Sequence, residues 1–168
     1  ELTGAEQYSD QTGTEAWDAI DDLPAKRYYF SMAYVEDHLY AFGGIDDSGI
    51  TKLSSILDYS EQSGLWNLHA ASLPREVAGT SAVPWYDSSE DKTYVLVFGN
   101  HVEEGNASAG DTQVGEVVFF DPELGTIALG TTLEGDDARM SAAVNLGGRI
   151  FLVCSSGNIW EYDPALDY

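Results

Sequence analysis

Three arginines stand where polar residues give way to runs of small and apolar ones. Arg27 precedes YYFSMAYV, Arg75 precedes EVAGTSAV, and Arg139 precedes MSAAVNL. A guanidinium presents a planar fork of donors that matches a carboxylate. We therefore expect these arginines to bind acidic groups of a partner, or to be neutralised internally by the acids around them.

A second set of polar residues lies in the segment HVEEGNASAGDTQ, residues 101–113, which is the longest stretch without strand character. Long loops on a rigid scaffold are common binding sites. The candidate partner-binding residues of this segment are His101, Glu103, Glu104 and Asn106. The alternative is a solvated insertion that binds nothing.

Residue types that support catalysis or metal binding are present but dispersed. His38 is expected in a turn and His69 in a strand, so a shared metal or catalytic triad is not indicated. The stretch IDDSGITK resembles the core of a calcium loop, but no further ligand follows at the EF-hand spacing. Cys154 lies in the apolar run IFLVC and is expected to be a buried, unreactive thiol. We predict no catalytic residue, no metal and no cofactor.

Charge excludes some classes of partner. The 168 residues include 29 acidic and seven basic side chains, for a net charge of −22. Such a field repels nucleic acids and anionic membranes. No window approaches the roughly 20 apolar residues of a membrane span, and residues 1–10 do not resemble a signal peptide. The acidity, the scarcity of lysine and the absence of disulfides fit an extracellular or cell-surface protein, and a cytoplasmic one as well.

One short phrase occurs repeatedly along the chain. Residues 8–13 read YSDQTG and residues 59–64 read YSEQSG, each with a Trp soon after. Weaker copies are FDPELG at 120–125 and YDPALD at 162–167. Intervals of this size, roughly 40 to 60 residues, indicate repeated supersecondary units.

Each unit is expected to form four antiparallel strands. In the first unit the pattern predicts strands over 28–35, 39–44, 53–60 and 65–71, with turns at 36–38 and 61–64. The repeated phrase is then the turn between the third and fourth strands, and the Trp packs between successive sheets. Gly43 and Gly44 are expected where neighbouring backbones approach closely.

The first unit resembles a kelch repeat, in which a Gly pair is followed by Tyr-Asp-like residues, a Gly turn and a Trp. The matching residues are Gly43, Gly44, Asp58, Tyr59, Gly64 and Trp66. Later units depart from the pattern, with Gly99-Asn100 in place of the Gly pair and Ile127 in place of Trp. The resemblance implies an all-β fold, namely a kelch-type β-propeller segment. In kelch adaptor proteins, arginines placed like Arg27, Arg75 and Arg139 bind acidic peptides.

The resemblance also implies a division of the chain. Residues 1–22 would end a preceding blade, 23–72 and 73–132 would form two blades, and 133–168 a third that lacks most of its outer strand. The remaining blades would come from a longer chain, from a second copy that completes a six-bladed ring, or an open arc would be capped by a partner. We expect a non-catalytic protein-binding module; the alternatives are a carbohydrate-binding or accessory domain of a secreted enzyme, or a structural part of a larger kelch enzyme.

Overall fold

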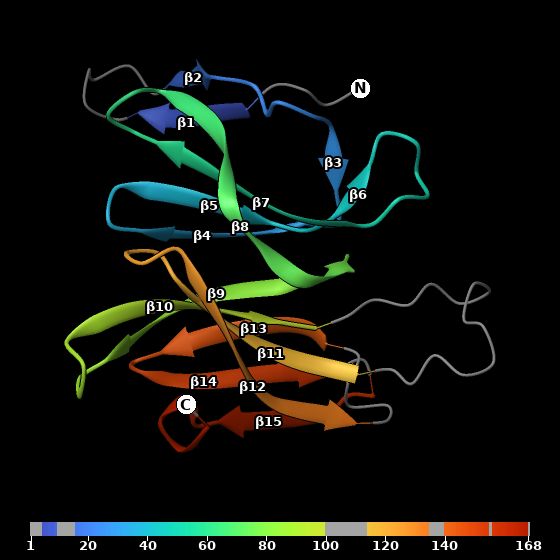
Figure 1. Ribbon diagram of the computed structural model, residues 1–168, viewed down its shortest axis with the longest axis vertical. Helices are drawn as coiled ribbons and strands as arrows, with labels where there is room; N and C mark the ends of the chain where they lie inside the picture. The colour runs from blue at the N-terminus through green and yellow to red at the C-terminus, as the bar shows by residue number, and fades with distance from the viewer. Residues whose placement is uncertain (1–4, 10–15, 100–113, 135–139, 155, 168) are drawn as a thin grey trace.

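The computed structural model describes residues 5–9, 16–99, 114–134, 140–154 and 156–167, which form an all-β protein, as the sequence predicts. Three antiparallel sheets follow one another along the long axis of the molecule (Figure 1). Within the described residues the helical element is the short 3-10 helix Pro164–Leu166, and no helix is long and apolar enough to cross a membrane.

Two of the sheets have four strands and the third has three, each in chain order. The first sheet contains β4 (Ser31–Val35), β5 (His38–Phe42), β7 (Leu53–Ser60) and β8 (Leu65–Val77). The second contains β9 (Ser81–Asp87), β10 (Lys92–Phe98), β11 (Val114–Asp121) and β12 (Thr126–Glu134). The third contains β13 (Met140–Leu146), β14 (Arg149–Cys154) and β15 (Ile159–Tyr162).

Two short pairings flank the first sheet. The hairpin of β1 (Ala5–Ser9) and β2 (Ala16–Ile20) precedes it along the chain. The two-residue strands β3 (Arg27–Tyr28) and β6 (Ile45–Asp46) pair with each other beside it. The second pairing joins the segment that enters the first sheet to the connection between β5 and β7.

In the two four-stranded sheets the repeated phrase forms the turn of the outer hairpin, as expected, whereas at 162–167 it leads into the 3-10 helix Pro164–Leu166. Gly64 has φ 69° and donates its N–H to the carbonyl oxygen of Ser60 at 2.8 Å. An aromatic before the turn stands directly opposite a bulky residue after it. These register pairs are Tyr8–Trp17, Tyr59–Trp66 and Phe120–Ile127. Ile127 therefore occupies the position of Trp66 in the second sheet.

The sheets pack face against face. We call the face of a sheet that is turned toward the next sheet along the chain its front face, and the opposite one its back face. The first interface joins Tyr40, Phe42 and Ile56 to Val95, Val97, Val118 and Phe120. The second joins Trp85, Leu96, Phe98 and Phe119 to Ile150 and Leu152. Residues 94–98 of β10 are buried on both faces of the sheet and accordingly read as an uninterrupted apolar run.

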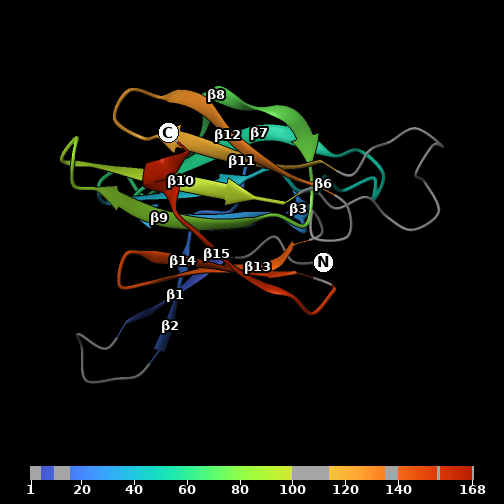
Figure 2. The ribbon, with the colours of Figure 1, turned by 90° about the horizontal axis from the view of Figure 1, so that it is seen from below.

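The first strands of the three sheets lie side by side. β9 contacts both β4 and β13. Hydroxyls join these strands, since the Oγ of Ser31 lies 2.8 Å from the Oγ1 of Thr80 and the Oγ of Ser81 accepts the N–H of Ala143 at 2.8 Å. Figure 2 shows the third sheet as a separate layer beside β9.

Some expected boundaries are wrong. The strand expected over 28–35 begins only at Ser31, because Tyr29 has φ 55° and turns the chain out of the sheet. His38 begins β5 and is not a turn residue, since the turn consists of Glu36 and Asp37, which both have positive φ. The strand expected over 65–71 continues as β8 to Val77, because two register shifts keep it paired to β7.

The Gly pair has the expected role. A Cβ on Gly43 would lie 2.7 Å from the carbonyl oxygen of Val77, and one on Gly44 would lie 2.9 Å from that of Tyr28. Both glycines have positive φ. The Gly pair thus brings the end of β5 against β8 and β3 and places the β5–β7 connection beside Arg27.

Candidate functional site

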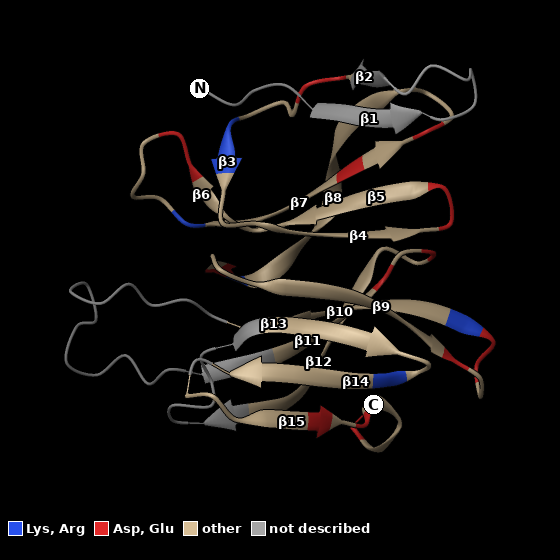
Figure 3. Ribbon diagram, turned by 180° about the vertical axis from the view of Figure 1, so that it is seen from behind, with Lys and Arg blue, Asp and Glu red and all other residues tan. Residues whose placement is uncertain are grey.

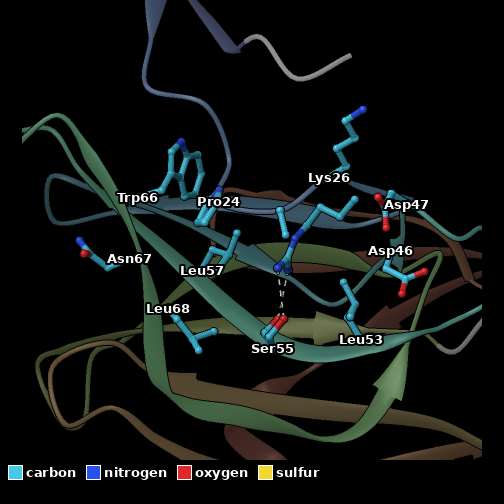
Figure 4. Close-up of a pocket in the computed structure, with 12 residues that line it drawn as sticks. Pro24, Lys26, Asp46, Asp47, Leu53, Ser55, Leu57, Trp66, Asn67 and Leu68 are labelled. Carbon is cyan, nitrogen blue, oxygen red and sulfur yellow. Dashed lines mark hydrogen bonds between the residues drawn. The ribbon is translucent and has the colours of Figure 1, made fainter. Parts of the chain in front are cut away.

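Arg27 is held by backbone and hydroxyl groups of the first sheet. Its Nη1 donates to the carbonyl oxygen of Gly43 at 3.1 Å. Nη1 also donates to the carbonyl oxygen of Ser55 at 3.4 Å, and Nη2 donates to the Oγ of Ser55 at 3.2 Å (dashed lines in Figure 4). Burial lowers the pKa of the Arg27 guanidinium from its ordinary value. These partners are uncharged, so the expected neutralisation of Arg27 by acids is not what fixes the side chain.

A pocket of about 580 Å³ opens beside Arg27. Its floor is apolar and comes from the back face of the first sheet, with Leu53 and Leu57 in β7 and Leu68 in β8. Its rim is polar and comes from two connections, the segment 24–27 and the acids Asp46 and Asp47. Apolar floors with a few polar rim groups are typical of binding pockets.

The rim carries both signs of charge. Lys26 is exposed and extends away from the leucines of the floor in Figure 4. Asp46 accepts hydrogen bonds from the N–H and the hydroxyl of Ser48, which hold the pKa of its carboxyl below the ordinary value although burial opposes this. Asp46 is therefore ionised at neutral pH, but its Oδ1 is already used within its own turn. The free cation of the rim is Lys26, while the Nε of Arg27 is buried without a hydrogen-bond partner among the described residues.

Arg75, the other predicted site residue that the structure describes, does not join this pocket. Arg75 lies in β8, is exposed, and is not among the residues that line the pocket. The remaining predicted site residues lie outside the described residues: Arg139, His101, Glu103, Glu104 and Asn106. Of the two predicted residues that the structure describes, the pocket contains Arg27, with Lys26 as a neighbour that the arginine pattern did not indicate.

A second polar cluster was not predicted. The Nδ1 of His38 lies 2.6 Å from the Oδ1 of Asp58 on the neighbouring strand. The ring of His38 stacks on Tyr40 at 5.9 Å, and His69 meets the same ring edge-on at 6.2 Å. Burial, with the charges of Asp58 and Glu36, raises the pKa of Tyr40 to about 12. Among the described residues, no group of three or more His, Cys, Asp or Glu side chains could hold a metal.

Tyrosine–aspartate pairs repeat at the first turn of two sheets. The hydroxyl of Tyr34 donates to Asp37 at 3.2 Å, and that of Tyr86 donates to Asp91 at 2.5 Å. Both tyrosines are exposed, and both aspartates have positive φ. Sequence reasoning missed this repeat, although the signal was a Tyr three to five residues before an acid in each hairpin.

Comparison with known proteins supports the fold. No family model matches the chain, and no curated protein matches it. The solved structure of YjhT is similar, with a TM-score of 0.66 and 17% sequence identity over 96% of this chain and 59% of that chain. The chain thus spans less than two thirds of the length of the YjhT chain. At this identity the likeness shows a shared fold alone.

Proposed function

We propose that the chain is a segment of a kelch-type β-propeller that acts as a non-catalytic protein-binding module. Successive antiparallel sheets that stack on their faces, with their first strands together, support the propeller assignment. The pocket beside Arg27 carries the binding role, because two connections of the first sheet form its rim while strands form its floor.

The ligand that fits this pocket is an extended acidic peptide. A leucine-sized side chain fills the space over Leu53, Leu57 and Leu68, and a neighbouring carboxylate pairs with the exposed Lys26. Asp46 and Asp47 exclude a second carboxylate on the far side of the pocket. The expected ligand therefore has one acid beside one apolar residue, not a run of acids.

The test uses three fluorescent hexapeptides that differ at one position, Leu-Glu, Leu-Gln and Leu-Lys. Fluorescence anisotropy should show the Leu-Glu peptide binding the most tightly. Lys26→Ala should remove that preference, since each exposed charge pair contributes up to about 1 kcal/mol. Lys52→Ala removes a charge from the connection between β5 and β7, which carries Asp46 and Asp47, but not from the pocket lining, and should leave binding unchanged. Equal binding of all three peptides would contradict the proposal.

Exposed aromatics favour a carbohydrate-binding role as the second candidate. Tyr34 and Tyr86 are 50% and 55% exposed and lie on β4 and β9, which contact each other. A sugar ring can stack on exposed aromatic faces while acids accept hydrogen bonds from its hydroxyls. Calorimetric titration with maltose, cellobiose and chitobiose tests this. Binding that Tyr34→Ala and Tyr86→Ala abolish, while Lys26→Ala does not, would favour the second candidate over the first.

A further inference from the structure

The connection between β5 and β7 folds into a tight turn over residues 46–51. The N–H of Asp46 donates to the carbonyl oxygen of Thr51 at 3.0 Å, and the N–H of Gly49 donates to that of Asp46 at 3.1 Å. Figures 1 and 2 show this turn, which follows β6, projecting from the side of the stack of sheets. The turn thus holds its shape by its own hydrogen bonds, at a place that the stacking of sheets does not use.

The two neighbouring acids of this turn have different surroundings. The Oδ1 of Asp46 accepts the N–H of Ser48 at 3.1 Å and is used within the turn. Asp47 is exposed and lines the pocket, and its carboxylate makes no hydrogen bond or ion pair within the part of the chain that the structure describes. Figure 3 shows the acidic stretch of the turn, in red, next to β3, with which β6 pairs. Asp47 is therefore the rim carboxylate that is available to a cation of the ligand.

Two exposed aromatic rings stand beside the same turn. Tyr28 is 40% exposed, and a Cβ on Gly49 would lie 2.9 Å from its hydroxyl oxygen, so the phenol reaches the turn. Tyr29 is 62% exposed and meets Tyr28 edge-on, with ring centres 5.3 Å apart and an interplanar angle of 63°. The turn that carries Asp47 is thus flanked by an aromatic pair whose rings support each other.

The backbone of Tyr29 has a strained conformation that burial does not explain. Its φ is 55°, and it lies two residues before Ser31, the first residue of β4. The matching place two residues before Ser81, the first residue of β9, holds Gly79 with φ 67°. Glycine adopts such a φ without strain, whereas tyrosine does not. Since Tyr29 remains mostly exposed, contact with a ligand explains an aromatic residue here better than the fold does.

We propose that the peptide ligand of the pocket carries an arginine, whose guanidinium pairs with Asp47 and packs on the ring of Tyr28. The inference rests on the proposed function, because it adds a second charged contact to the one with Lys26 in the same pocket. A planar guanidinium both pairs with a carboxylate and stacks on an aromatic ring, and a lysine ammonium matches this combination less well. The rim then selects a ligand with one acid and one arginine.

The test must separate a contact at one place from general attraction, because a chain of net charge −22 attracts any cation. Four fluorescent peptides contain Leu-Glu with an Arg before it, with an Arg after it, or with Gln in either place. Fluorescence anisotropy should show one Arg placement binding about five-fold tighter than its Gln counterpart, as for a strong exposed ion pair. The other placement should gain little, since Asp47 occupies one point of the rim. Equal gains from both placements would overturn the proposal.

Protein variants locate the contact. Asp47→Asn should abolish the gain from Arg, whereas Glu61→Gln should retain it. Glu61→Gln is the matched control, because it removes one exposed acid in the turn between β7 and β8, outside the pocket lining. Circular dichroism checks that each variant is folded. A gain that survives Asp47→Asn would overturn the contact.

The aromatic part has its own test. A peptide with Lys in place of Arg should bind the wild type less tightly, and Tyr28→Leu should bring the two peptides to the same affinity. Equal binding of the Arg and Lys peptides by the wild type would overturn the contact with Tyr28.

This inference and the proposed function fail in different ways. Preference for Leu-Glu over Leu-Gln, without any gain from Arg, would leave the proposed function intact and overturn the inference. A gain from Arg that depends on Asp47, without preference for Leu-Glu, would contradict the contact with Lys26 and support the one with Asp47.

Discussion

The two ends of the stack of sheets carry the same kind of surface in different surroundings. At one end, the back face of the first sheet holds Trp66, which is 8% exposed and donates its Nε1–H to the carbonyl oxygen of Asp21 at 3.1 Å. At the other end, the front face of the third sheet holds Ile159, which is 67% exposed. Both residues lie at apolar positions of the repeat, but the segment 20–30 covers only the first of these two faces.

The difference shows that the repeat determines which residues are apolar, and that the neighbouring element determines how much each contributes to stability. The free energy of burial depends on the area removed from water. An apolar residue without a neighbour contributes little to the fold and is available for association.

The largest expected effect is at the covered end. Trp66→Ala should lower the free energy of unfolding by about 4 kcal/mol, because it removes a buried indole and leaves a cavity. Ile159→Ala should change it by no more than about 0.5 kcal/mol at protein concentrations where the chain is monomeric. Urea unfolding followed by circular dichroism measures both. Equal losses would mean that the front face of the third sheet is also covered.

The next effect compares an ion pair inside the stack with the one on the uncovered face. Asp121 is buried and its Oδ2 lies 2.8 Å from the Nζ of Lys92. Asp121→Asn should lower the free energy of unfolding by about 2 kcal/mol, since it removes a charged hydrogen bond of buried Asp121 and leaves Lys92 only the longer contact of 3.8 Å to Glu123. Glu161→Gln should have little effect on stability, because both Glu161 and Arg149 are exposed.

The Asp121 pair also predicts a pH dependence. Burial alone would raise the pKa of Asp121, but hydrogen bonds from Lys92 and from backbone amides outweigh it and hold the pKa below its ordinary value of 3.8. The stability that Asp121 adds is thus present above pH 3.8 and is lost as the pH falls through the lower folded pKa. The free energies of unfolding of the wild type and of Asp121→Asn, measured by urea unfolding at each pH, should therefore converge as the pH falls below 3.8. A difference that stays constant would contradict this assignment.

The smallest effect compares two glycines. Gly43 and Gly147 have φ 61° and 64°, so alanine is strained at both. At Gly43 the new Cβ would also lie 2.7 Å from the carbonyl oxygen of Val77, whereas nothing lies within 4 Å at Gly147. We expect the free energy of unfolding to fall by about 2 kcal/mol for Gly43→Ala and by about 1 kcal/mol for Gly147→Ala. Thermal unfolding of the two variants, side by side, would show whether the contact at Gly43 adds to the strain.

Much of the fold follows from local patterns. The strand expected over 53–60 coincides with β7, and the turn at Gly64 is where the phrase YSEQSG places it. The predicted strand boundaries are wrong where a single backbone angle or a register shift determines the end of a strand. The positive φ of Tyr29 separates β3 from β4, and no pattern of side chains in the sequence predicts this backbone angle. The extension of β8 to Val77 depends on bulges in its pairing with β7.

The site was less accessible from the sequence. The spacing of Arg27 and Arg75 suggested matching roles, but Arg27 is anchored on Ser55, while Arg75 is exposed on β8. The anchor lies 28 residues away along the chain, so no local window contains both partners. The His38–Asp58 contact could not be predicted from the sequence either, because the two residues are far apart along the chain and come together only when β5 pairs with β7.

The side-by-side placement of β4, β9 and β13 also bears on how the molecule opens. The main contacts between sheets join neighbours, so the second sheet is held from both sides and the third from one. Cooperative units with fewer neighbours open at lower free energy. Amide hydrogens of β14 should therefore exchange with solvent deuterium sooner than those of β10. The sheets should unfold one after another, and the third sheet should unfold first.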